Sequence, residues 1–172
     1  MTEGLKLRRT ISAAIMRPIC SSIIIMGAVG VIELDRKYLR IMMEAGYVLI
    51  GMRRFDDAKK IFEGLSLLSP ESEIPIVALG GVSFCEGDFQ KAILYYRKAL
   101  KVDPQSFFAK VYLGEALLFS GKKQEGLDLL EEVKSIDERG PAGHFAQALL
   151  EAIEKGFVPK KDAHAKKLRS VH

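Results

Sequence analysis

The sequence is poor in the residues from which enzymes and metal proteins build their sites. It has two cysteines, three histidines and no tryptophan. Cys20 and Cys85 cannot form a disulfide framework, and so few cysteines fit a reducing compartment. HExxH, CxxC, GxSxG and phosphate-loop motifs are absent, and Gly80-Gly81 lacks the rest of a dinucleotide-binding fingerprint. We therefore expect no metal and no cofactor.

The excess of positive over negative charge is concentrated near the C-terminus. The formal net charge is +4, and the last stretch carries six Lys and Arg residues after Glu154 against the single Asp162. A nucleic-acid-binding protein would show a basic face with aromatic or base-reading groups instead. We predict a disordered basic tail over residues 157–172 and no nucleic-acid partner.

The N-terminal segment, residues 1–38, is apolar from Ile11 to Ile32. Arg17 and Pro18 interrupt it, which argues against a signal peptide, and no small-residue cleavage site is clear. The uninterrupted run from Ile19 to Leu34 is shorter than the roughly 20 residues of a membrane span. We expect one or two helices that cap the rest of the fold or pair two copies as a homodimer. A signal peptide and a short membrane segment are the alternatives.

A regular period runs through the middle of the chain, because the interval from Gly46 to Gly80 is repeated from Gly80 to Gly114. Steps of this length align small residues with small ones and large apolar residues with large apolar ones, without a gap. The aligned sets are Gly46, Gly80 and Gly114; Ala58, Ala92 and Gly126; Phe62, Tyr96 and Leu130; Phe55 and Phe89; and Pro70 and Pro104. Such internal repetition is typical of proteins built from stacked, similar units.

Each unit is expected to form two helices, A and B, joined by a tight turn. A glycine inside helix A costs about 1 kcal/mol relative to alanine, which is tolerable where it lets helix B come close. Gly87 and Gly121 supply the turns, because glycine readily takes positive φ. In the first unit the glycine, Gly51, comes two residues earlier, so we expect a less regular turn. Pro70 and Pro104 end the B helices.

The set Leu79-Gly80, Gly87, Phe89, Ala92, Tyr96, Ala99 and Pro104 resembles the tetratricopeptide repeat (TPR). The resemblance implies an all-α fold, an α-solenoid of three TPR helix hairpins that follows the N-terminal helical segment. The repeats would span residues 39–72, 73–106 and 107–140 within a TPR domain of residues 39–156. After Pro141, an amphipathic stretch predicts a C-terminal capping helix over residues 141–156.

The resemblance also implies a peptide-binding groove on the inner surface formed by the A helices. Three of its twelve inward positions, Arg40, Gly81 and Glu115, are not large apolar residues. The other nine would form a larger exposed apolar patch than a monomer usually leaves uncovered. Alternatively, they are core residues, or the N-terminal segment or a second copy covers them. These nine predicted groove residues are Met43, Tyr47, Ile50, Ile74, Val77, Phe84, Phe108, Val111 and Leu118.

Two stretches, Arg54 to Leu65 and Leu113 to Gly121, resemble the first and third repeats of the small TPR chaperones of bacterial type III secretion. In that family the groove holds an apolar segment of a translocator or needle subunit before export. The resemblance implies a cytoplasmic protein whose partner supplies an apolar peptide or an amphipathic helix. The alternative is a TPR scaffold or adaptor that bridges subunits of a larger, membrane-associated assembly.

Two other functions fit the sequence less well. TPR domains that clamp acidic C-termini need Lys, Asn and Arg on the A helices, where this chain has residues such as Tyr47, Gly81 and Tyr112. Cys85 is the one candidate nucleophile within the repeats, and none of the histidines falls there. A small apolar role is the simpler interpretation of this cysteine. We therefore predict that the protein is not an enzyme.

Overall fold

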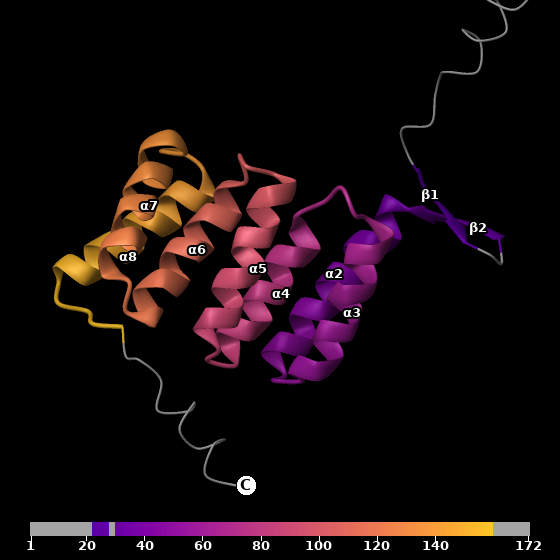
Figure 1. Ribbon diagram of the computed structural model, residues 1–172, viewed down its shortest axis with the longest axis horizontal. Coiled ribbons are helices and arrows are strands. Elements are labelled where there is room, and N and C mark those ends of the chain that lie inside the picture. Colours follow the sequence, from indigo (N-terminus) through magenta and orange to yellow (C-terminus); the bar gives the residue numbers. More distant parts are fainter. Residues whose placement is uncertain (1–21, 28–29, 160–172) are drawn as a thin grey trace, which may run out of the picture. The chain divides into compact units, whose positions relative to one another are not determined.

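The computed structural model describes residues 22–27 and 30–159 (Figure 1). By its contacts the described part of the chain divides into two units, one that ends at residue 39 and one that begins at residue 40. The basic tail predicted for residues 157–172 lies almost wholly outside the described residues. Two strands precede seven helices in the described part. They are β1 Ser22–Gly27, β2 Gly30–Asp35, α2 Arg36–Gly51, α3 Phe55–Leu68, α4 Ile74–Cys85, α5 Phe89–Val102, α6 Phe107–Ser120, α7 Lys123–Ile136 and α8 Pro141–Glu154.

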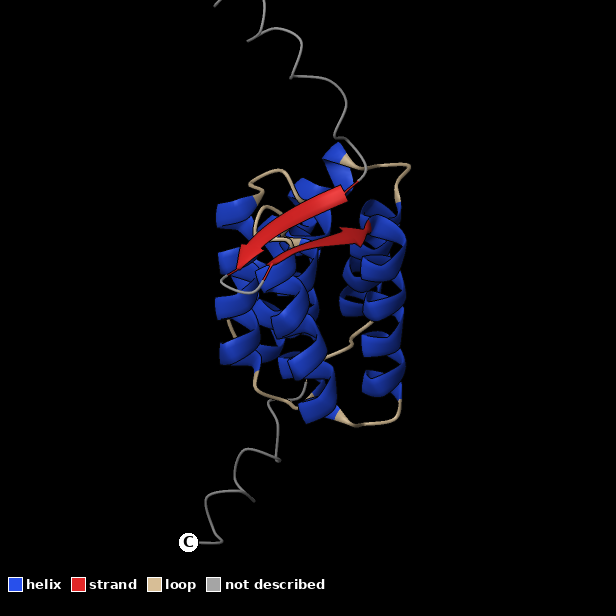
Figure 2. Cartoon of the chain, turned by 90° about the vertical axis from the view of Figure 1, so that its right-hand side faces the viewer, coloured by secondary structure: helices blue, strands red, loops and turns tan. Residues whose placement is uncertain are grey.

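Strands β1 and β2 form an antiparallel hairpin, drawn as two red arrows in Figure 2. Its register pairs Ser22 with Asp35 and Gly27 with Gly30. The prediction of an N-terminal helical segment is therefore wrong for these residues. The physical reason is composition, because the strands are rich in β-branched isoleucine and valine, and glycines flank the short connection. Residues 11–21, the first part of the apolar segment, lie outside the described residues.

The helices confirm the predicted all-α solenoid. Consecutive helices α2 and α3, α4 and α5, and α6 and α7 form three hairpins, and α8 follows as a final helix (Figure 1). Helices α3, α5 and α7 begin at equal intervals along the chain, at Phe55, Phe89 and Lys123. No helix of residues 36–159 combines the length and hydropathy that crossing a bilayer requires.

The turns follow from residues that accept left-handed backbone or cap a helix. Gly87 and Gly121 end α4 and α6 with φ values of 81° and 89°. In the first hairpin, whose glycine comes early, Arg53 takes the left-handed conformation with φ 59°. Asp88 and Ser106 cap α5 and α6, since their side-chain oxygens accept hydrogen bonds from the backbone N–H groups of Lys91 and Ala109.

Each hairpin is held by a glycine on helix A that lies directly against a large side chain on helix B. A Cβ atom built at Gly46 would overlap the Phe62 ring, and one at Gly80 would overlap the Tyr96 ring. At Gly114 a Cβ would lie 3.0 Å from Leu130 Cγ. Phe62, Tyr96 and Leu130 are almost completely buried. The periodic glycines therefore set the spacing between the two helices of each repeat.

This close packing predicts that Gly80→Ala lowers the free energy of unfolding by about 1–3 kcal/mol, the usual range for overpacking a core. Gly81→Ala is the matched control on the same helix, because a Cβ there meets nothing within 4 Å. It should instead raise stability by up to about 1 kcal/mol through helix propensity. Urea denaturation followed by far-UV circular dichroism measures both changes. Equal effects of the two substitutions would contradict this account of the hairpin.

Candidate protein-binding face

The nine predicted groove residues do not share one environment. Tyr47, Ile74 and Phe108 are about half exposed, with 50%, 52% and 48% of their surface open to solvent. Met43, Ile50 and Phe84 are half-buried. The remaining three, Val77, Val111 and Leu118, are buried in the core.

The three buried residues pack between helices. Val111 and Leu118 belong to a cluster with Ala146 and Leu150 of α8, and Val77 belongs to a cluster that joins α4, α5 and α6. The repeat position alone did not identify them. Val77 and Val111 each precede a packing glycine by three residues, but so does Met43, which is half-buried. The three buried residues present almost no surface to a ligand.

Aromatic rings of α5, α6 and α8 surround Tyr112 of α6. Its ring centroid lies 6.3 Å from that of Phe108, 5.7 Å from that of Phe145 on α8, and 6.0 Å from that of Tyr96. The Tyr47 ring of α2 lies 5.5 Å from that of Phe62, and burial, with a smaller contribution from Tyr112, raises the pKa of its hydroxyl. We group the exposed and half-buried residues that α2, α4, α6 and α8 contribute as the aromatic face: Tyr47, Ile74, Phe108, Tyr112 and Phe145.

Ile74 and Phe108 occupy the same position in consecutive A helices. Ser106 Oγ donates a hydrogen bond of 3.1 Å to Glu73 Oε1, which ties the start of α6 to the start of α4. Tyr112 and Phe145 were not among the predicted site residues. The repeat period could not identify Phe145, because α8 lies beyond the third repeat, and its contact with Tyr112 depends on tertiary packing.

A single carboxyl group, Glu115, belongs to this part of α6. Burial raises its pKa from an ordinary 4.5 to about 7. Burial raises the pKa values of Tyr96, Tyr112 and Cys85, and the Glu115 carboxylate raises each of them further. The face thus combines aromatic surface with one carboxyl group that titrates near neutrality.

Phe84 belongs to a different cluster. Its ring centroid lies 5.1 Å from that of Phe89 and 5.2 Å from that of Phe119, and Phe119 lies 6.2 Å from Phe157. Phe157 follows α8 after Gly156, whose φ is 95°. The four rings fasten the segment after α8 to the ends of α4 and α6.

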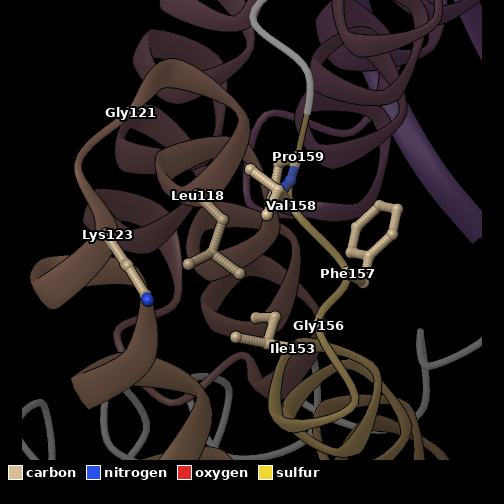
Figure 3. A pocket seen from close by; sticks show the side chains of 8 residues that line it. All are labelled: Leu118, Gly121, Lys123, Ile153, Gly156, Phe157, Val158 and Pro159. Carbon is tan, nitrogen blue, oxygen red and sulfur yellow. The ribbon is translucent and has the colours of Figure 1, made fainter.

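A cavity of about 530 Å³ lies beside this cluster, where Leu118 and Ile153 point toward one another (Figure 3). Its lining is mostly apolar, with the amine of Lys123 as the only charged side chain among the lining residues. The residues that line it are Leu118, Gly121, Lys123, Ile153, Gly156, Phe157, Val158 and Pro159. It offers no set of groups that would position a reacting substrate.

Cys85 lacks the environment of a reactive nucleophile. Burial and the nearby Glu115 raise the pKa of its thiol, and Arg53 opposes this only in part. The thiol therefore stays protonated at neutral pH, whereas a nucleophilic cysteine needs a lowered pKa. Residues 36–159 also hold no group of three His, Cys, Asp or Glu side chains that could bind a metal ion.

The comparisons with known proteins agree with this architecture. The tetratricopeptide repeat model matches residues 76–106, which comprise most of α4 and all of α5. A DnaJ homolog subfamily C member 7 homolog of Schizosaccharomyces pombe is 31% identical over 85 residues, or 49% of this chain. The matched segment spans only 18% of that relative's length. One stretch of the chain therefore matches the tetratricopeptide repeat by sequence, and it coincides with the second helix hairpin of the structure.

Solved structures of type III secretion chaperones have a similar fold. PcrH of Pseudomonas aeruginosa superposes with a TM-score of 0.61 and 21% identity, over 70% of this chain and 95% of PcrH. The translocator chaperone SycD of Yersinia enterocolitica gives 0.61 and 20%, over 69% and 91%. PcrH has also been solved in complex with the chaperone-binding region of PopD, and that structure gives 0.59 and 21%, over 71% and 95%. At these identities the likeness establishes the fold alone.

The unusual Glu115 predicts a distinctive pH dependence of stability. Its folded pKa of about 7 exceeds the ordinary 4.5, so the folded protein keeps a proton that the unfolded chain has released. Stability contributed by this group is therefore present below pH 4.5 and is lost as the pH rises toward 7. Glu115→Gln should accordingly be more stable than the wild type by about 1–3 kcal/mol at pH 8, with little difference at pH 4.

Urea denaturation across this pH range measures the difference between the two proteins. Glu131→Gln is the control, since Glu131 is an exposed carboxyl group on α7 whose side chain is 57% open to solvent. It should show no such trend. If the advantage of Glu115→Gln did not change with pH, the carboxyl group would not be buried as described.

Proposed function

We propose that this protein is a chaperone that binds an apolar segment of a type III secretion translocator on the aromatic face. The observation that carries the proposal is the half exposure of Tyr47, Ile74 and Phe108 on successive A helices. The fold likeness to PcrH and SycD supports it, because PcrH was solved with chaperone-binding regions of PopD and PopB and SycD with a peptide of YopD. A chaperone of this kind acts in the cytoplasm, before its client is exported.

The physical basis of the binding is the removal of apolar surface from water. Fully burying an exposed large apolar side chain contributes about 1.5–3 kcal/mol, and covering a half-exposed one contributes about half of that. Apolar contacts along the whole face are therefore needed for the affinity of a peptide complex. Aromatic side chains are suited to this task, because they offer a large contact area and lose little rotamer freedom. The client would supply leucine-like side chains from an extended segment or an amphipathic helix.

The core residues keep this surface rigid. Val111 is fully buried beneath the face, and Tyr96 and Tyr112 stack with an interplanar angle of 30°. A rigid, preformed face loses less conformational entropy when a peptide binds. Val77, Val111 and Leu118 therefore act as its support, and the contact with the client is assigned to Tyr47, Ile74, Phe108, Tyr112 and Phe145.

A TPR adaptor is the second candidate. The sequence identities are compatible with a role outside secretion, because a DnaJ homolog is 31% identical over part of this chain whereas the secretion chaperones are about 20% identical. An adaptor would join proteins that are already folded, and a chaperone would keep an aggregation-prone client soluble. Pairing of two copies through residues 1–38 remains a prediction for either function.

Charged substitutions on the aromatic face test the proposal. Tyr47→Glu and Phe108→Glu should each weaken client binding at least about tenfold, since a charge would be buried without a partner. The fold should remain intact because both positions are half exposed. The matched control is Leu94→Glu, which places the same charge at a residue of α5 that is 67% exposed. Its binding should equal that of the wild type.

The client is identified by mass spectrometry of proteins that purify with the tagged chain from its own organism. We expect a protein that is insoluble when expressed alone and soluble when co-expressed with the wild type or with Leu94→Glu. The two variants of the aromatic face should fail to solubilise it. Recovery of partners that are folded and soluble by themselves would contradict the chaperone function and favour the adaptor.

A further inference from the structure

The middle A helix lacks a side chain at one inward position of the repeat. Tyr47, Gly81 and Glu115 are each one repeat period apart and so occupy the same position in α2, α4 and α6. The middle helix has no side chain at this position, and a Cβ built at Gly81 meets nothing within 4 Å. Space is therefore open above Gly81, on the helix that lies between the two others in chain order. We call this space the Gly81 recess.

Glu115 differs from every other half-buried carboxyl group of residues 36–159. It makes no ion pair and accepts no hydrogen bond within that range, whereas each of the others has a partner. Those partners are Arg54 for Asp57, Ser106 for Glu73, Lys59 for Glu86, the backbone N–H of Gln105 for Asp103, and the backbone N–H groups of Ala142 and Gly143 for Asp137. A half-buried carboxyl group without a partner is costly, because desolvation of the charge is not offset.

The groups that face Glu115 are all uncharged at neutral pH. They are the Cys85 thiol of α4, the Tyr96 hydroxyl of α5 and the Tyr112 hydroxyl of α6, and the pKa of each is raised. Tyr47 of α2 interacts with both tyrosines and is also uncharged. Helices α7 and α8 bring no titratable group that alters the pKa of Glu115, for which burial is the only cause. Arg53 and Glu86 act on the pKa of Cys85, but no cation of residues 36–159 pairs with Glu115 or lowers its pKa.

We propose that the client segment inserts a basic side chain, lysine or arginine, into the Gly81 recess, where it pairs with Glu115. The inference rests on the proposed function and adds a residue type to the client. Charge complementarity is the argument, since a bound cation supplies the missing partner and restores the ionised carboxylate. The tyrosine rings favour the same occupant, because the faces of aromatic rings attract cations. An apolar side chain in this place would bury Glu115 more deeply and leave it unpaired.

The proposal predicts the direction in which the affinity for a basic peptide changes with pH. A lysine-bearing peptide binds the ionised form of Glu115, whose share rises from about a tenth at pH 6 to about nine tenths at pH 8 for a pKa of about 7. Lysine itself stays charged over this range. The affinity of the protein for the lysine-bearing peptide should therefore rise about tenfold between pH 6 and pH 8. A peptide with norleucine in place of lysine favours the protonated carboxyl, so its affinity should fall over the same range.

The first experiment selects a phage-displayed library of random peptides against the full chain at pH 8. The wild type should enrich peptides that carry spaced apolar residues together with one Lys or Arg at a constant position. The net charge of +4 opposes nonspecific enrichment of basic peptides, so such a signal reports a local acidic site. Glu115→Gln should keep the apolar pattern and lose the basic position. Glu131→Gln, the exposed control on α7, should select as the wild type does.

The second experiment titrates a selected peptide and its norleucine counterpart by calorimetry between pH 6 and pH 8. We expect the opposite slopes given above for the wild type and no slope for Glu115→Gln. Gly81→Leu tests the recess itself, because the leucine side chain enters open space and leaves the packing at Gly80 untouched. It should remove most of the preference for lysine over norleucine.

The outcomes separate this inference from the function on which it rests. If the wild type and Glu115→Gln both select apolar peptides without a basic position, the inference is wrong. The proposed chaperone function would not be affected by that result. Parallel pH slopes for the two peptides would overturn the inference as well. Failure of the wild type to enrich any apolar peptide, or enrichment unaffected by Phe108→Glu, would overturn the proposed function itself.

Discussion

The close contact between a glycine on helix A and a large side chain on helix B determines both the fold and the binding face. In the second repeat the ring of Tyr96 fills the space left by the missing side chain of Gly80. The helices can therefore lie near each other while the ring stays almost fully buried. The buried Tyr96 ring also stacks on Tyr112 of the following repeat, with the ring centroids 6.0 Å apart. One packing contact thus joins two helices and also helps to form the site.

The repeated part of the fold could be predicted because each repeat carries its own packing contact in the sequence. The third repeat departs from the pattern at Gly126, and the structure explains this substitution. A Cβ there would lie 2.8 Å from the carbonyl oxygen of Gly114, so two glycines face each other and the smaller Leu130 replaces a ring. The β-hairpin of residues 22–35 was not predicted, because hydrophobicity alone does not distinguish a short buried helix from a strand. Its β-branched composition was the informative signal.

The candidate site was predicted less well than the fold, for a physical reason. The register of a repeat predicts which way a side chain points. Whether that side chain is buried depends on the elements that pack against it. Val111 and Met43 share one register position, yet Val111 is fully buried beneath α8 whereas Met43, on the first A helix, is half-buried. Phe145 could be assigned to the face only once its contact with Tyr112 was known. Solvent exposure is a tertiary property, and a sequence period cannot supply it.

Glu115 shows how an apolar binding face can acquire selectivity. Burial of hydrophobic surface depends on area and little on direction, so a face made only of aromatic and aliphatic residues would accept many apolar segments in several registers. One unpaired carboxyl group changes this, because any complex that covers it without a partner bears the full desolvation penalty. The penalty falls on incorrect registers and incorrect clients, whereas a correctly placed cation removes it. The aromatic residues would then supply affinity, and Glu115 would determine which segment binds and in which register.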